Sequence, residues 1–192
     1  MVLCKWSVMT RFFIIMLFYV LVACNGVSDY KKEIAQMQTN SIVLPLNEMN
    51  CILKGNDTLF SSGTKSLKYV VYSDTSSCSY CDLGKVLKWK KTLRESRQYS
   101  GDLSFYFIFH PSQGKFANFN FHLRTLEIPI PVYVDTLGIF ERSNPHLSHN
   151  PMFHTFLLDE NNNVLLVGNP LENEKIEEMF WQIVEEKLGK RE

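Results

Sequence analysis

Short apolar runs and helical periodicities alternate along the last two thirds of the chain. Residues 69–72 are β-branched or aromatic, and residues 103–109 are apolar or aromatic everywhere except at Ser104. A run that is apolar on both alternating faces predicts a strand covered on both sides, so 103–109 is expected at the centre of a sheet. Between the two runs, a helical spacing joins Leu83, Val86, Leu87, Trp89 and Leu93.

A second helix and a third strand follow the central strand. Pro129 ends a helical pattern, and residues 131–135 (Pro-Val-Tyr-Val-Asp) return to a β-rich run. The helix is predicted from apolar residues at steps of three, four and three, namely Phe116, Phe119, Leu123 and Leu126.

Hairpin signals stand on both sides of these units. Residues 52–60 contain a Gly-Asn-Asp turn signal at Gly55, and residues 155–167 contain a polar turn at 159–163. A last amphipathic pattern over 176–188 is closed by Gly189. The order ββ, βαβαβ, ββα predicts an α/β domain with a mixed central sheet between helices and an N-terminal β-hairpin.

The first 23 residues have the pattern of a signal peptide. Lys5 and Arg11 precede residues 12–22, an unbroken apolar run of 11 residues. As a helix this run is roughly 16 Å long, about half of the ~30 Å hydrocarbon core, which argues against a permanent membrane span. Residues 1–23 are therefore predicted to be removed.

Residues 21–24, Leu-Val-Ala-Cys, resemble the lipobox of bacterial lipoproteins, in which the cysteine is acylated and becomes the new N-terminus. The resemblance implies palmitate-type lipidation of Cys24, and two or more acyl chains give stable anchoring. The alternative is an ordinary signal peptide with Cys24 as a bystander. Residues 24–47 are predicted to be a tether with a short helix, and 48–192 a domain in the bacterial cell envelope, on the inner or outer membrane and facing the periplasm.

Composition and charge restrict the functions that the protein can have. The chain of 192 residues is 45% hydrophobic, which suits one compact domain, expected to be monomeric. Its 20 basic and 20 acidic residues become 18 and 20 once Lys5 and Arg11 leave with the leader. A net charge near −2 without a long basic cluster excludes nucleic acid as a partner.

The domain keeps three thiols, Cys51, Cys78 and Cys81. One close pair and one odd cysteine do not make a disulfide-stapled scaffold, so Cys78 and Cys81 are interpreted as reactive or metal-binding. Cys51 lies in an apolar, strand-like stretch and is expected to be a buried small side chain.

Three segments, in their order and spacing, resemble the thioredoxin-like superfamily. They are the strand 69–72 leading into Cys-Ser-Tyr-Cys, residues 131–135, and Thr-Phe-Leu-Leu-Asp at 155–159. The resemblance is greatest to envelope thiol-disulfide oxidoreductases related to cytochrome-maturation reductases, and to peroxiredoxin-type lipoproteins of Bacteroidetes-like bacteria. It covers residues 48–188 and implies a three-layer α/β/α fold.

The predicted layout suits thiol-disulfide chemistry. Where the strand meets the helix N-terminus, the helix dipole favours a thiolate, so Cys78 is the expected nucleophile. Cys81 lies within reach on the first helical turn and would resolve a mixed disulfide. The expected partners are protein thiols and disulfides, with no organic cofactor and no metal. The direction of electron flow stays open.

Members of the superfamily carry a cis-proline before the strand that corresponds to residues 155–158. Counting back from Asp159 places Phe153 at that position, with Pro151 two residues too early. Either the loop shifts to bring Pro151 opposite Cys78, or the family proline is absent, and we expect the second. A cis bond before phenylalanine would cost about 3–4 kcal/mol. Pro151, Phe153 and Thr155 are the candidate substrate-loop residues.

Three alternatives remain for the cysteine motif. Thr75 precedes Cys78 as in peroxiredoxins, although the proline of that motif is missing. Copper-chaperone relatives place a histidine before the last hairpin, where this chain has His146, His149 and His154. The third alternative is a redox-inactive lipoprotein that uses the fold as a binding module.

Overall fold

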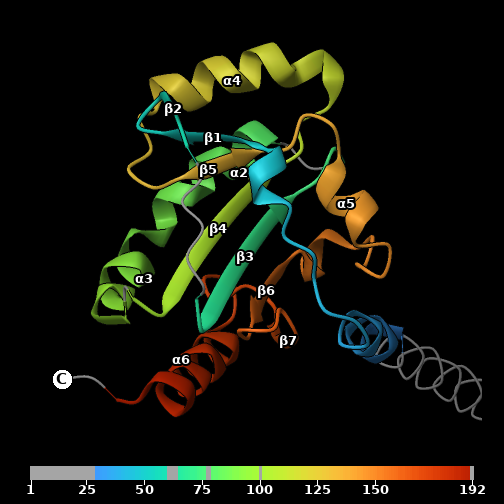
Figure 1. The fold of residues 1–192 in the computed structure, drawn as a ribbon, viewed down its shortest axis with the longest axis vertical. Helices are drawn as coiled ribbons and strands as arrows, with labels where there is room; N and C mark the ends of the chain where they lie inside the picture. Colours follow the sequence, from blue (N-terminus) through green and yellow to red (C-terminus); the bar gives the residue numbers. More distant parts are fainter. Residues whose placement is uncertain (1–28, 60–64, 77–78, 100, 191–192) are drawn as a thin grey trace, which may run out of the picture.

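A single seven-stranded sheet forms the centre of the molecule (Figure 1). The computed structural model describes residues 29–59, 65–76, 79–99 and 101–190, and only the backbone of residues 79, 80 and 82. The strand order is β2-β1-β5-β4-β3-β6-β7. The strands are β1 (Asn50–Leu53), β2 (Asn56–Thr58), β3 (Leu67–Ser73), β4 (Leu103–Phe109), β5 (Val132–Val134), β6 (Thr155–Leu158) and β7 (Val164–Val167).

The central strands are parallel and the outer ones antiparallel. β3 pairs with β4 over seven residues and β4 pairs with β5, both in parallel, whereas β6 runs antiparallel to β3 and β7 to β6. The prediction that residues 103–109 form the central strand is confirmed, because three strands lie on each side of β4. The carboxyl ends of β3, β4 and β5 consequently meet at one edge, where open α/β sheets bind ligands.

β1 and β2 form an antiparallel pair at the opposite side of the sheet from β7. Their turn lies at Lys54 and Gly55, with φ of 49° and 77°, a combination typical of tight hairpin turns. The turn predicted over 55–57 is therefore displaced, and Asp57 lies in β2, where its carboxylate accepts hydrogen bonds of 2.8 and 2.9 Å from Arg124. A Cβ on Gly55 would lie 2.5 Å from the Arg124 carbonyl oxygen, so this turn requires glycine.

The helix predicted after the cysteine motif is broken into four pieces. They are α2 (Ser79–Val86), the 3-10 turn η2 (Leu87–Trp89), α3 (Lys90–Glu95) and the 3-10 turn η3 (Ser96–Tyr99). Trp89 is 2% exposed and its ring lies 5.3 Å from that of Tyr69 and 5.7 Å from that of Phe107. Burial of this indole in the core coincides with the change from 3.6 to 3.0 residues per turn.

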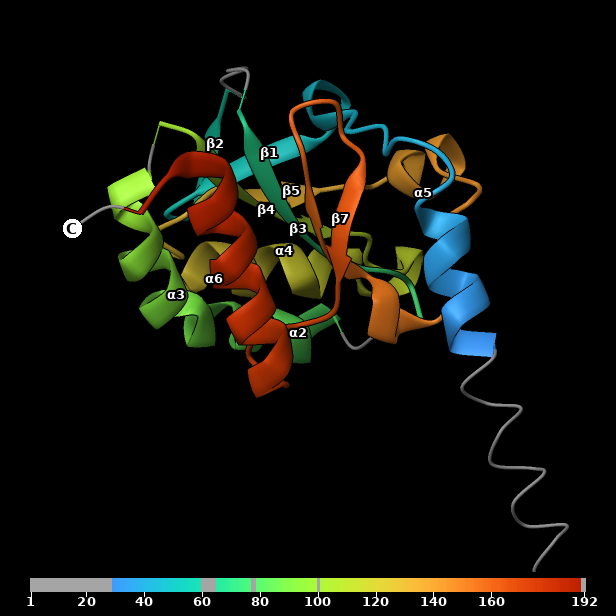
Figure 2. The same cartoon turned by 90° about the horizontal axis from the view of Figure 1, so that it is seen from below.

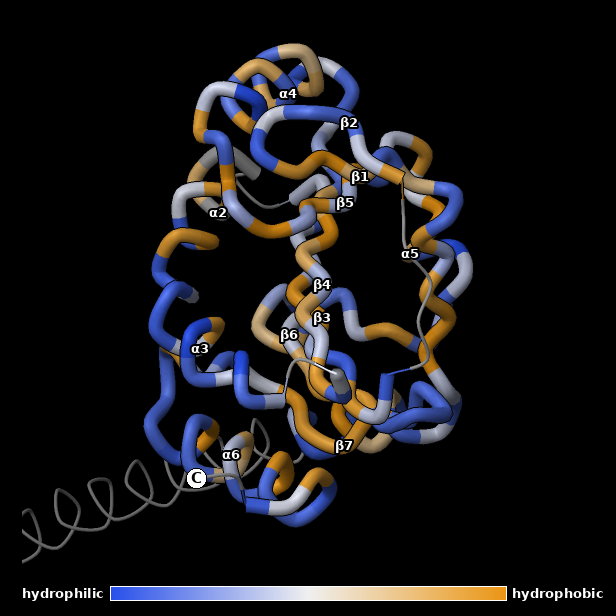
Figure 3. Tube along the Cα trace, turned by 60° about the vertical axis from the view of Figure 1, so that its left-hand side comes forward, coloured by the Kyte–Doolittle hydropathy of each residue, from blue (hydrophilic) through white to orange (hydrophobic). Residues whose placement is uncertain are grey.

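Two hydrophobic clusters cover the two faces of the sheet, which confirms the three-layer α/β/α architecture (Figure 3). One face is covered by α2, α3, α4 (Phe116–Thr125) and α6 (Glu174–Leu188), and the other by the N-terminal segment and α5 (Ile139–Ser143). Shorter 3-10 turns are η1 (Leu46–Glu48), η4 (Gln113–Lys115) and η5 (Pro151–Phe153).

The N-terminal segment packs on the domain. Residues 29–37 form a helix, drawn in blue in Figure 2. Met37 and Ile42 are 0% and 1% exposed. Ile42 N donates to Asn162 O at 2.8 Å. The core therefore extends into residues that the sequence analysis assigned to the tether. No helix within the described ranges is long and apolar enough to cross a membrane.

Candidate functional site

Cys81 lies in the first turn of α2, directly beyond the carboxyl end of β3. Leu83 and Val86 turn the helix toward the core and are 0% and 3% exposed. Cys81 precedes Leu83 by two residues, a rotation of about 200°, and is accordingly exposed. It is disulfide-bonded, and Cys51 is free, so its partner lies outside the described residues. Cys78 and Cys24 also lie outside them.

A groove of about 310 Å³ begins one helical turn from Cys81. Lys85, which is four residues after Cys81 and so on the same side of α2, lines it. Pro151 and Thr155 of the predicted substrate loop line it too. The remaining lining residues come from β3, the end of α2, η2, β4, η5 and the loop after β7: Val71, Tyr72, Ser73, Val86, Trp89, Phe109, Met152, Asn169 and Glu172.

Phe153, the third predicted substrate-loop residue, does not reach this groove. Its side chain is 6% exposed and packs in the cluster on the other face, with its ring 5.7 Å from that of Tyr30. Within the described residues no peptide bond is cis. Met152, in contrast, is 63% exposed beside Pro151 and offers an apolar contact.

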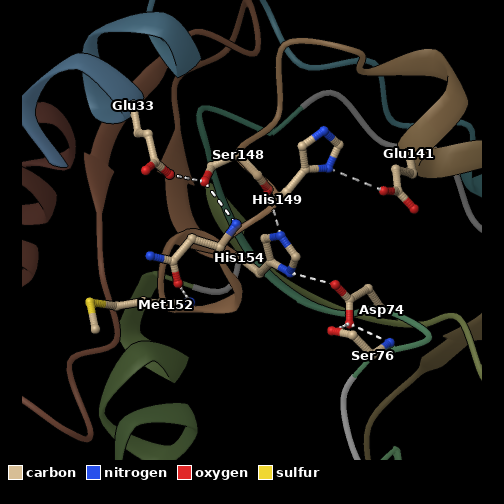
Figure 4. A network of polar contacts seen from close by, with 9 residues as sticks. Glu33, Asp74, Ser76, Glu141, Ser148, His149, Met152 and His154 are labelled. Atoms are coloured by element: carbon tan, nitrogen blue, oxygen red, sulfur yellow. Dashed lines mark hydrogen bonds and ion pairs between the residues drawn. The ribbon is translucent and has the colours of Figure 1, made fainter. Parts of the chain in front are cut away.

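A network of polar contacts connects the end of β3 with the loop before β6 (Figure 4). Asp74, the first residue after β3, accepts hydrogen bonds through Oδ1 from Ser76 N at 2.9 Å and Ser76 Oγ at 2.6 Å. Its Oδ2 lies 3.8 Å from His154 Nδ1, and His154 Nε2 lies 2.7 Å from Ser148 O. The network thus joins two loops that are far apart in sequence.

The three candidate metal-binding histidines do not converge. His154 is 3% exposed in the network, while the His149 side chain is 91% exposed and lies 3.8 Å from Glu141. Among the residues with described side chains, no three of histidine, cysteine, aspartate and glutamate are grouped so that they could hold a metal ion.

Cys51 is a buried side chain, as predicted from its apolar surroundings. It is 5% exposed on β1 and contacts Tyr133 on β5. Burial raises the pKa of the Cys51 thiol, although the hydrogen bond with Tyr133 opposes this change. A thiol of this kind is a poor nucleophile, because the thiolate is the reactive species.

Asp74 and Ser148 were not predicted as site residues from the sequence, and His154 was predicted only as a possible metal ligand. The spacing Asp74-Thr75-Ser76 is a turn signal that could have been found, since aspartate side chains bind the backbone two residues on. The contact with His154 had no such signal, because 80 residues separate the two and neither belongs to a periodic pattern.

The fold is thioredoxin-like. A parallel βαβ unit with an exposed cysteine at its helix start lies beside an antiparallel ββα unit in one mixed sheet. No protein-family model and no curated protein matches the sequence.

Several solved structures are similar to the chain. A thioredoxin-like protein of Porphyromonas gingivalis is 15% identical over 80% of this chain and 97% of its own, with a TM-score of 0.49. An exposed lipoprotein thioredoxin of Streptococcus pneumoniae is 14% identical over 62% and 86%, with a TM-score of 0.45. A putative thiol:disulfide interchange protein DsbE of Chlorobium tepidum is 19% identical over 62% and 80%, with a TM-score of 0.43.

Proposed function

We propose that the protein is a thiol-disulfide oxidoreductase of the bacterial cell envelope, tethered to the membrane through lipidated Cys24 and acting on protein substrates. The observation that carries this proposal is Cys81: it is exposed, disulfide-bonded, and one helical turn from a groove. We assign its partner as Cys78, the neighbouring cysteine of the motif. A disulfide at an exposed helix start is open to an incoming thiolate.

The exchange proceeds in two steps that balance. In the reducing direction, the Cys78 thiolate attacks a substrate disulfide, forms a mixed disulfide and releases one substrate thiolate. The Cys81 thiolate then attacks Cys78 Sγ, breaks the mixed disulfide and releases the second substrate thiolate, which leaves a Cys78–Cys81 disulfide. An external dithiol restores the reduced pair. The same steps in reverse oxidise a substrate.

The groove suits an extended polypeptide segment. Pro151 and Met152 give it apolar contacts, and Lys85 and Glu172 add charges of both signs. Its volume is that of a few side chains, so the disulfide to be exchanged is expected in a chain that lies along the groove.

Insulin reduction by the full chain in mild detergent, with dithiothreitol as the reductant, tests this proposal. Cys78→Ser and Cys81→Ser are expected to abolish turnover, and Cys81→Ser is expected to accumulate a mixed disulfide at Cys78. Cys51→Ser is the matched control and is expected to keep full activity, because the thiol is buried and free. A wild-type chain without turnover would favour a redox-inactive binding lipoprotein.

A further inference from the structure

The helix over residues 29–37 presents one face to the domain and contacts the loop that leads into η5 (Figure 4). Helical spacing places residues 30, 33, 34 and 37 on that face. Met37 is 0% exposed, and Ile34 packs against the same hydrophobic cluster. The helix is therefore fixed to the domain by its apolar side chains, although it precedes the region that resembles the thioredoxin-like superfamily.

A polar contact links this helix to the start of η5. Ser148 Oγ donates a hydrogen bond to Glu33 Oε2 and accepts one from Asn150 N at 3.0 Å. A hydroxyl has one proton and two lone pairs, so the bond to Glu33 fixes its proton and leaves a lone pair to Asn150. The Asn150 side chain in turn caps η5, because its Oδ1 accepts from Met152 N at 3.1 Å. A chain of hydrogen bonds thus runs from Glu33 to Met152.

An aromatic contact holds the other end of η5. Phe153 is its last residue, and the Phe153 ring lies 5.7 Å from the Tyr30 ring at an interplanar angle of 74°. This edge-to-face arrangement is one of the two that aromatic pairs prefer. Phe153 is 6% exposed, whereas Tyr30 is 46% exposed and covers it from the solvent side. The N-terminal helix therefore supports the turn at both of its ends.

The turn η5 depends on such support because it is short. It is a 3-10 turn of three residues, whose backbone bonds join Phe153 N to Asn150 O at 3.0 Å and His154 N to Pro151 O at 3.1 Å. A single turn of this kind lacks the repeated bonds that stiffen a longer helix. Its first two residues, Pro151 and Met152, line the groove. Where these two side chains lie is consequently set by the contacts around the turn.

We propose that Glu33 is a positioning residue for substrate binding in the groove. Through Ser148 and Asn150 it holds η5, and η5 presents Pro151 and Met152 to an extended substrate segment. The inference rests on the exchange activity proposed above. It gives the helix over residues 29–37, which the sequence assigned to a tether, a part in the substrate site. Glu33 acts on binding and not on the exchange step, because it contacts the loop and does not line the groove.

Insulin reduction by the full chain in mild detergent, measured over a range of insulin concentrations, tests the inference. Glu33→Ala is expected to raise KM about fivefold, the effect of one lost hydrogen bond, and to leave kcat unchanged. Glu33→Gln should keep the KM of the wild type, because its amide oxygen still accepts from Ser148 Oγ. In a Ser148→Ala chain, Glu33→Ala should add no further effect, because Glu33 acts through that hydroxyl. Lys32→Ala, which changes an exposed residue of the same helix, is the matched control and should behave as the wild type.

Hydrogen exchange gives a second readout that needs no activity. In Glu33→Ala the amides of Asn150 and Met152 should lose protection, while that of Ile108 in the central strand β4 should keep it. Unchanged protection of the first two amides overturns the inference, and so does an equal loss at all three, which indicates a chain that is merely destabilised. A fall in kcat at constant KM, or a Glu33→Gln chain no better than Glu33→Ala, overturns it as well. A wild type without turnover refutes the proposed function and not the support of η5, which the two amides then decide by themselves.

Discussion

Replacing Asn144 by alanine removes two hydrogen bonds to the N-terminal segment and one to α5. Asn144 is 1% exposed; its Oδ1 accepts from Val43 N at 2.8 Å, and its Nδ2 donates to Val43 O at 2.9 Å and Phe140 O at 2.7 Å. The bond to Phe140 O is buried, whereas the two to Val43 are partly open to water. The variant thus weakens the attachment of residues 37–46 to the rest of the fold.

The expected loss in the free energy of unfolding follows from how deeply each of these hydrogen bonds is buried. Leaving the buried Phe140 carbonyl without its partner costs about 1–3 kcal/mol, and each partly exposed bond adds about 0.5–1 kcal/mol, because water replaces it in part. We expect Asn144→Ala to lower the free energy of unfolding by about 3 kcal/mol, which corresponds to roughly 6–12 °C in Tm for a chain of this size.

Urea denaturation of the full chain in mild detergent, followed by far-ultraviolet circular dichroism, measures this loss. Hydrogen exchange adds a local test: the Val43 amide should exchange faster in Asn144→Ala. Asn40→Ala is the matched control, because Asn40 is exposed and its side-chain amide donates to the neighbouring Thr39 Oγ1 at 3.1 Å. A change below about 0.5 kcal/mol in Asn144→Ala, equal to that of the control, would refute the reasoning.

Three further substitutions test single interactions by the same denaturation. Tyr69→Phe removes the bond from a fully buried hydroxyl to Gly168 O, 2.8 Å long, and should cost about 1–1.5 kcal/mol. Lys68→Met leaves three oxygens of the turn 159–162 without their ammonium donor and should cost about 2 kcal/mol. Partial burial raises the pKa of Asp159, but hydrogen bonds from residues 161 and 163 outweigh it, so its pKa lies below the ordinary 3.8. The ionised carboxylate therefore contributes its full stabilisation above pH 3.8, and this contribution is lost as the pH falls through the depressed pKa. The difference in the free energy of unfolding between the wild type and Asp159→Asn should accordingly narrow between pH 6 and pH 3.

The periodic parts of the fold were predictable because they are long and regular. The apolar run 103–109 identified β4, and the alternation of such runs with amphipathic patterns identified the βαβ units. The irregular parts carried no comparable signal. α5 has only five residues, too few for a helical period, and the division after α2 depends on where the Trp89 ring fits in the core.

The candidate site was predictable only where residues are close in sequence. The cysteine spacing indicated Cys81 at a helix start. Counting back from Asp159 indicated the loop that contains Pro151 and Thr155, two residues that line the groove. Phe153 points away from the groove because the turn η5, to which it belongs, buries this ring against the other cluster. The Asp74–His154 contact depends on the pairing of β3 with β6, which no local pattern specifies.

A redox titration of the cysteine motif tests the proposed exchange chemistry most directly. The full chain is equilibrated in glutathione buffers of graded potential, denatured in an alkylating reagent and digested with trypsin. Cleavage after Lys68 and Lys85 releases one peptide with both Cys78 and Cys81, and Cys51 in another peptide is an internal standard. If the two cysteines exchange as proposed, the peptide gains two alkyl groups together in one two-electron transition, while Cys51 gains one in every buffer. A peptide whose alkylation does not change with potential, or that gains a single group, would contradict the proposed exchange.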